Sequence, residues 1–176
     1  MNEGHIIKAI YESEKNSWMK RLPTEKILAS ITTARNLSVE LTKFDSSFSI
    51  KSPTLIRRAT EEDKHLLLSF IKENFGNGWL ETIENAFIQA KIPLFLAEEK
   101  GEIIGVSSYD VYLHKKGLYG PMGVLEKSRN NNVGKGLLYT ALKDMKDRGY
   151  YYAILGEEGP IEYYEKVCNA KLITYI

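Results

Sequence analysis

The residues best suited to chemistry lie between Met122 and Leu142, where an apolar strand, an Asn- and Gly-rich turn and an amphipathic helix follow one another. Such a turn can direct several backbone N–H groups toward one point, and the helix behind it adds the positive end of its dipole. Arg129 and Lys135 add two full positive charges. The segment therefore predicts a phosphate site, and we interpret it as a site for a pyrophosphate.

Two carboxylates and two phenols near the C-terminus are further candidates. Glu157 and Glu158 follow a predicted strand at residues 151–155, at the carboxyl end where the ligands of open α/β sheets gather. Tyr163 and Tyr164 lie in a predicted short helix. A phenol with a pKa near about 10 can protonate a leaving group of similar basicity.

Strand and helix patterns alternate from residue 54 onward. Apolar runs bounded by turn residues predict strands, and apolar residues spaced by three and four predict helices. The strands are predicted at residues 55–59, 94–97, 103–112, 117–125, 151–155 and 172–175, and helices are predicted to begin at Thr60, Leu80, Val133 and Pro160. This order predicts a mixed α/β (α+β) fold with an antiparallel start and a parallel strand–helix–strand finish.

The N-terminal part of the chain has a different pattern. Helical spacing over residues 1–50 predicts two helices, the second with Leu37 and Leu41 among its inward residues. The Ser-rich stretch 44–53 reads as a linker or an extended segment. We therefore predict a helical extension over residues 1–50, suited to packing or to a homodimer surface, and a separate domain over residues 51–176.

Composition favours a small-molecule ligand. The 176 residues carry 24 Lys and Arg against 23 Asp and Glu, a net charge of +1, which does not favour nucleic acid or an anionic membrane as the partner. The single cysteine, Cys168, excludes an internal disulfide and is compatible with a reducing cytoplasm, and the three histidines lack metal-ligand spacing, so no metal is predicted. No segment approaches the roughly 20 apolar residues of a membrane helix, and the N-terminus lacks the apolar core of a secretory signal. We therefore expect a cytoplasmic protein.

Three segments resemble the GNAT superfamily of acyl-CoA N-acyltransferases, over about the last two thirds of the chain. Residues 56–63 are similar to the family's first strand and helix start. The family's pyrophosphate motif is Arg or Gln, two residues, Gly, one residue, then Gly or Ala, and it falls on Arg129, Asn132 and Gly134. Residues 162–170 resemble the aromatic-Tyr-Glu-Lys segment of the family's last helix. The resemblance implies a GNAT-like mixed, partly splayed sheet flanked by helices.

This sequence departs from the family pattern in three places. Asn132 replaces the first motif glycine, which is acceptable at a left-handed residue because Asn enters that region more readily than other non-glycine residues. A shifted alignment over residues 131–136 also places glycines but loses the arginine, so we prefer the first alignment. An asparagine that many relatives use to contact the cofactor falls on Glu157. The sequence stops at Ile176, about where the family's final strand begins, so the sheet edge must be completed in another way.

The resemblance implies that the chain binds acetyl-CoA (coenzyme A). The strand before the turn, Met122, Gly123 and Val124, would pair with the pantetheine arm and offer an N–H group to the acyl carbonyl. The Gly120-Pro121 pair supports a bulged or splayed strand there. The side chain of Arg129 would take the outer phosphates, and the pyrophosphate would be bound by the backbone amides of Asn130, Asn131, Asn132, Val133, Gly134 and Lys135.

The implied activity is an acetyl-CoA-dependent N-acetyltransferase, in which a primary amine attacks the thioester directly in a ternary complex. The family register makes Tyr164, rather than Tyr163, the general acid for the departing thiolate. Glu157 or Glu158 could act as general base through water, and a mechanism without a dedicated base stays open.

The acceptor would be an unidentified small-molecule or peptide amine. Residues 74–92 and 112–118 are expected to wall the acceptor side, and together they show no single charge signature. The alternative is a non-catalytic acyl-CoA-binding module for sensing or assembly, which would bind the thioester without releasing thiol to any amine.

Overall fold

The structure is a computed structural model that describes residues 36–50, 53–112, 115–129, 131–156 and 161–173. Two compact units divide the chain, residues 1–35 and 36–176, and all the described residues belong to the second unit. The first predicted helix and most of the second therefore lie outside the described residues.

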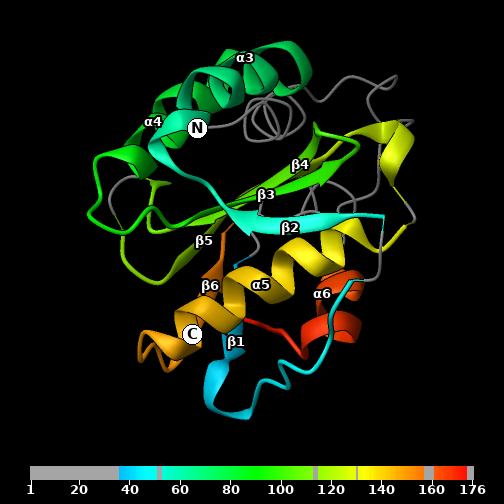
Figure 1. The fold of residues 1–176 in the computed structure, drawn as a ribbon. Coiled ribbons are helices and arrows are strands. Elements are labelled where there is room, and N and C mark those ends of the chain that lie inside the picture. Colours follow the sequence, from blue (N-terminus) through cyan, green and yellow to red (C-terminus); the bar gives the residue numbers. More distant parts are fainter. Residues whose placement is uncertain (1–35, 51–52, 113–114, 130, 157–160, 174–176) are drawn as a thin grey trace, which may run out of the picture. The chain divides into compact units, whose positions relative to one another are not determined.

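A seven-stranded mixed sheet forms the centre of this unit, in the order β2-β3-β4-β5-β6-β1-β7 (Figure 1). Its strands are β1 (Leu37–Glu40), β2 (Leu55–Arg58), β3 (Leu94–Glu99), β4 (Glu102–Tyr109), β5 (Leu118–Val124), β6 (Tyr152–Leu155) and β7 (Lys171–Leu172). Neighbouring strands are antiparallel except β5 and β6, which run parallel. The predicted mixed fold, with its antiparallel start and parallel finish, is confirmed.

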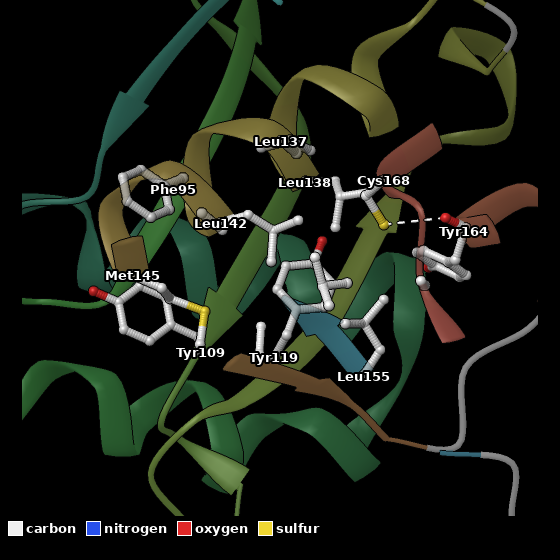
Figure 2. Close-up of a cluster of buried hydrophobic side chains, with 14 of the residues drawn as sticks. Phe95, Tyr109, Tyr119, Leu137, Leu138, Leu142, Met145, Leu155, Tyr164 and Cys168 are labelled. Atoms are coloured by element: carbon white, nitrogen blue, oxygen red, sulfur yellow. Dashed lines mark hydrogen bonds between the residues drawn. The ribbon is translucent and has the colours of Figure 1, made fainter. Parts of the chain in front are cut away.

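Helices cover both faces of the sheet. They are α3 (Lys64–Phe75), α4 (Leu80–Phe87), α5 (Val133–Asp147) and α6 (Ile161–Cys168), with short 3₁₀ turns at Leu41–Lys43, Glu61–Asp63, Asn77–Trp79 and Glu126–Ser128. Helices α3 and α4 lie on one face, and α5 and α6 lie on the other (Figure 1). Each pair buries its own apolar cluster against the sheet, and Figure 2 shows the cluster under α5 and α6. Both faces of the central strands are thus buried, which explains their nearly continuous apolar sequence.

The strand β1 corrects the prediction for the N-terminal extension. Leu37 and Leu41 are buried, as expected, but Leu37 belongs to a strand and not to a helix. Strand β1 pairs with β6 on one side and with β7 on the other, both antiparallel. Residues 36–50 therefore belong to the compact unit that contains the sheet, and β1 completes the sheet next to β6.

Strands β5 and β6 separate after a short paired segment. The first two residues of β5 pair with Ile154 and Leu155, and the pairing then stops. On its other edge β5 continues to pair with β4, where a register shift between Ser107 and Tyr109 marks a bulge. The bulged and splayed strand predicted around residue 120 is confirmed.

Asp144, near the end of α5, ties this helix to the sheet. Its carboxylate accepts hydrogen bonds from the Tyr109 hydroxyl on β4 and the Arg58 guanidinium on β2, and it pairs with Lys91 at 3.2 Å and Arg148 at 3.1 Å. Burial alone would raise the pKa of Asp144, but the bonds from Arg58 and Tyr109 outweigh burial and lower the pKa to about 2. The ionised carboxylate therefore stabilises the fold above its ordinary pKa, and this contribution is lost as pH falls toward 2.

The N-terminal end of α5 is preceded by a residue in the left-handed conformation. Asn132, which precedes the helix, has φ 61° and ψ 10°, the left-handed conformation in which an asparagine can replace the motif glycine. The Gly136 N–H donates to the Asn132 carbonyl at 2.8 Å, the first hydrogen bond of the helix. Gly136 also lies against β2, because a Cβ built on it would be 2.6 Å from Cδ1 of Ile56. The left-handed residue sets the direction in which the chain enters α5.

We expect the Asp144→Asn variant to lose about 2 kcal/mol of unfolding free energy at neutral pH, because Arg58 is left with a partly buried, unpaired charge. Asp147→Asn is the matched control on the same helix, since the Asp147 side chain is 58% exposed in its pair with Lys143 and should contribute under about 1 kcal/mol. Urea unfolding measures both variants. The difference in unfolding free energy between the wild type and Asp144→Asn should become smaller as pH is lowered from about 4 toward 2. A constant difference over that range would contradict a stabilising role for the ionised Asp144 carboxylate.

Substitutions at residue 132 test the left-handed turn. Asn132→Gly should keep or slightly raise the unfolding free energy, whereas Asn132→Val should lower it by about 1–2 kcal/mol, because a β-branched residue is strained at positive φ. Asn131→Val is the control, since Asn131 is not among the residues with positive φ. Equal unfolding free energies for the two valine variants would show that the turn does not impose this backbone conformation.

Candidate functional site

The N-terminus of α5 presents backbone donors to its surroundings. The N–H groups of residues 131–135 donate to no acceptor within the described part of the chain. The first N–H groups of any helix lack intrahelical acceptors and carry the positive end of the helix dipole, so they suit an anion. The predicted phosphate turn therefore has its main-chain donors available.

Gly134 is the residue of this turn that faces the sheet. A Cβ built on it would lie 3.7 Å from Cγ2 of Val124, 3.9 Å from Sδ of Met122 and 3.9 Å from the Tyr163 hydroxyl oxygen. These are ordinary van der Waals distances, so a methyl group would fit at residue 134 and a larger side chain would crowd its neighbours. Gly136, in contrast, is explained by its contact with β2, which favours the alignment that uses Asn132 and Gly134 as the motif positions.

The two cations predicted for the phosphate site lie differently. The Arg129 Nε donates to the Val124 carbonyl at 3.3 Å, which holds the turn against the end of β5. The Lys135 ammonium lies over two aromatic rings, 4.3 Å from the centroid of Phe48 and 5.3 Å from that of Tyr139. The Lys135 ammonium thus makes cation–π contacts in this structure. Only the backbone N–H group of Lys135 belongs to the set of amides at the turn.

Residues 120–124 of β5 have one free edge. Residues 122–124 pair with β4 and residues 120–121 lie in the bulge, and no described strand pairs with the other edge of this segment. Met122 and Val124 face the α5 side, as their approach to Gly134 shows, and Gly123 faces the stacked rings of Phe75 and Trp79, since a Cβ on it would be 2.6 Å from Phe75. An extended ligand could therefore pair with this edge in the manner of an added strand.

An open cleft of about 820 Å³ lies where β5 and β6 separate. Residues 118–122 of β5 and Ile154 of β6 line it, together with residues from both segments that were predicted to wall an acceptor, 74–92 and 112–118. Met122 lines the cleft and also approaches Gly134, so it connects the cleft with the phosphate turn.

Two cleft side chains were not named by the sequence analysis, Trp79 and Tyr112, and two more, Lys115 and Lys116, were interpreted with His114 as an exposed hairpin end. Their segments were indicated, but the side chains that face the cleft were not. The position of the two lysines in the sequence, just before the strand that separates from its neighbour, could have indicated that they lie at the cleft.

Helix α6 places one phenol, Tyr163, beside the phosphate turn and buries the other, Tyr164, which is not among the residues that line the cleft. Tyr164 is 4% exposed and belongs to the same buried cluster as Tyr119 and Leu155, the last paired residues of β5 and β6 (Figure 2). The neighbouring Tyr163 ring lies edge-on to it at 5.1 Å, and its hydroxyl is the group near Gly134. Burial raises the pKa of Tyr163, so this phenol is held in its protonated form.

Cys168, one turn after Tyr164, is not a nucleophile in this arrangement. Burial raises the pKa of its thiol to about 12, and its Sγ donates to the Tyr164 carbonyl at 3.2 Å. A buried, protonated thiol fills space in the core.

Several predicted groups fall outside the described residues: Asn130, Glu157 and Glu158. Among the residues that the structure does describe, no group of three or more His, Cys, Asp or Glu side chains is placed to hold a metal ion. No helix in the described ranges is both long and apolar enough to cross a membrane.

Comparisons with known proteins agree with this geometry. The family model of the acetyltransferase (GNAT) family matches residues 58–169. A GCN5-related glucosamine N-acetyltransferase region of a fungal multi-domain β-N-acetylglucosaminidase superposes with a TM-score of 0.67 at 15% identity, and a GCN5-related N-acetyltransferase from Sphaerobacter thermophilus with 0.63 at 16%. The match covers 91% of this chain but 22% of the fungal protein, and 84% of this chain but 52% of the Sphaerobacter protein.

A GNAT acetyltransferase from Brucella melitensis, solved in complex with acetyl-CoA, superposes with a TM-score of 0.51 at 18% identity, over 71% of this chain and 90% of that protein. A comparison with curated proteins finds no match. At these identities the solved structures establish the fold, and the family model, which matches more than half of the sequence, establishes the family. The chain belongs to the acetyltransferase (GNAT) family.

Proposed function

We propose that this chain transfers an acetyl group from acetyl-CoA to a primary amine by direct attack in a ternary complex. The observation that carries the proposal is that the amides of residues 131–135 donate to no acceptor in the described part of the chain and that Gly134 among them lies against Met122 and Val124 of β5. In the reaction the amine nitrogen bonds to the thioester carbonyl carbon, the carbon–sulfur bond breaks, and the sulfur leaves as a thiolate that must gain a proton while the nitrogen loses one.

The turn and helix would bind the pyrophosphate. The amides of residues 131–135 lie at the positive end of a 15-residue helix, and Gly134 leaves room for a phosphate to approach them. Arg129 lies at the entrance to the turn and is exposed, so its guanidinium can reach the outer phosphates. Asn130 would add its amide to this set.

The free edge of β5 would position the thioester. Met122, Gly123 and Val124 have backbone groups on this edge, and pairing with the pantetheine arm would fix the acyl carbonyl near a backbone N–H group. Because Met122 lines both the cleft and the turn, this path leads from the phosphate site to the cleft in which an amine could attack.

Tyr164 would donate the proton to the departing thiolate. Tyr164 belongs to the buried cluster that also contains Tyr119 and Leu155, where β5 and β6 separate, and a phenol can serve as a general acid. Glu157 or Glu158, at the end of β6, would accept the amine proton through water, although an amine that arrives neutral needs no dedicated base.

Substitutions at Gly134 test the phosphate site. Gly134→Val should weaken acetyl-CoA binding by at least about tenfold, because the isopropyl group fills the space beside the amides, whereas Gly134→Ala should bind within about threefold of wild type, since its Cβ meets nothing closer than 3.7 Å. Calorimetric titration of the full chain with acetyl-CoA measures both, and equal melting temperatures confirm that both variants fold. Absence of uptake by the wild type at millimolar concentrations would refute the proposal.

The two phenols of α6 provide a matched test of the general acid. Tyr164→Phe should lower kcat by about 100-fold while acetyl-CoA affinity stays within about threefold, because only proton transfer to the thiolate is removed. Tyr163→Phe should change kcat by less than about threefold. Thiol release measured with an amine panel gives both values, and a large loss confined to Tyr163→Phe would move the acid to that residue. Tight acetyl-CoA binding by wild type without thiol release to any amine would instead indicate a non-catalytic binding module.

A further inference from the structure

We propose that the acceptor is a primary amine whose apolar body carries an anionic group at a distance from the amine, and that Lys115 and Lys116 bind this anion. The inference rests on the proposed function, since it identifies the substrate class of the same cleft. It derives from the charges and the apolar surfaces of the described residues that line the cleft.

The described lining of the cleft carries charge of one sign. Lys115 and Lys116 are its charged side chains, and no Asp or Glu is among the described residues that line it. Neither lysine forms an ion pair with a described residue. The rim of the cleft therefore presents two exposed cations that have no partner in the described part of the chain.

The loop that carries these lysines is anchored. Asp110 accepts hydrogen bonds from the Gly117 N–H at 2.6 Å and the Tyr150 hydroxyl at 2.5 Å, and the Lys115 N–H donates to the Tyr112 carbonyl at 3.1 Å. The Asp110 carboxylate is buried in these contacts, so it holds the loop in place and leaves the lysine charges available to a ligand.

Acidic residues of the neighbouring helix are directed elsewhere. Glu84 on α4 lies 3.8 Å from Lys64 on α3, and Glu81 is not among the cleft residues. On the same segment, Lys91 is paired with Asp144 outside the cleft. The mixed charge of residues 74–92 in the sequence therefore does not extend to the described cleft lining, which keeps its positive character.

The remaining surfaces of the cleft suit an apolar body. Trp79 and Tyr112 supply aromatic surface on its walls, and Leu118, Pro121 and Met122 supply apolar surface along β5. Trp79 is held by stacking on Phe75, with ring centroids 4.9 Å apart and planes 14° from parallel. A flat, apolar group would find preformed contacts between these walls and β5.

The two lysines also select against some acceptors. Acceptors that carry further cations in place of the anion, such as polyamines, would be repelled by Lys115 and Lys116. The described lining thus favours an amine that carries a distal anion in the same molecule.

The test compares acceptors that share one reacting amine. Acetylation of 4-(aminomethyl)benzoate by the full chain should proceed with a kcat/KM about tenfold above that of 4-(aminomethyl)benzamide at low salt, an advantage of the size that two exposed ion pairs supply. The advantage should shrink at high salt because exposed charges are screened. The corresponding phosphonate shows whether the site prefers a phosphate-like anion. Calorimetric titration of the coenzyme A complex with the same probes provides a readout that is independent of turnover.

The lysines are tested by a double variant and a matched control. Lys115→Gln combined with Lys116→Gln should abolish the preference for the anionic probes, whereas Lys72→Gln, which removes an exposed lysine of α3 that does not line the cleft, should leave it intact. Two results would overturn this inference if acetyl-CoA still binds. The first is that the benzamide is turned over or bound as well as both anionic probes, and the second is that no probe binds at 10 mM. Failure to take up acetyl-CoA would overturn the proposed function as well.

Discussion

The separation of β5 from β6 is the constraint on which the site depends. Parallel pairing ends after two positions, so among the described strands only β4 pairs with residues 122–124 of β5. Backbone donors and acceptors at such an edge need partners from water or from a ligand. An ordinary continuous sheet would close this edge and remove the cleft of about 820 Å³ at the same time. The candidate binding surface therefore lies where the regular pairing of the sheet is interrupted, between β5 and β6.

Helix α5 links this interruption to the rest of the core. Its C-terminal part is fixed to β2 and β4 through Asp144, and its apolar face is buried with Leu137, Leu138 and Leu142. Its N-terminal part begins after the left-handed Asn132, and Gly134 in its first turn lies against the side chains of Met122 and Val124. Because a helix is stiff, fixing both ends places the amides at a defined position relative to β5. Preorganised donors of this kind lose little freedom when an anion binds.

Local sequence patterns predicted most of this architecture, and they failed where the pairing partner is distant in sequence. The hairpin of β3 and β4 and the start of α5 follow from a few adjacent residues, which is why they were predicted correctly. Leu37–Glu40 is four residues long, and its apolar spacing toward Leu41 also fits a helix, so only its pairing with β6, more than a hundred residues later, identifies it as a strand. The positive charge of the described cleft lining could not be predicted for a related reason, since the sequence does not show that Glu84 contacts Lys64.

The position of β1 has a consequence for how the chain must assemble. This strand leaves the ribosome before the rest of the described sheet, yet its neighbours β6 and β7 are among the last described segments to be synthesised. Until those segments emerge, β1 has no described strand with which to pair. Contacts between residues so far apart in sequence slow the formation of a sheet. Among the described residues, β7 is attached to the sheet through β1. Among the described strands, the first to be synthesised, β1, therefore attaches the last, β7, to the sheet.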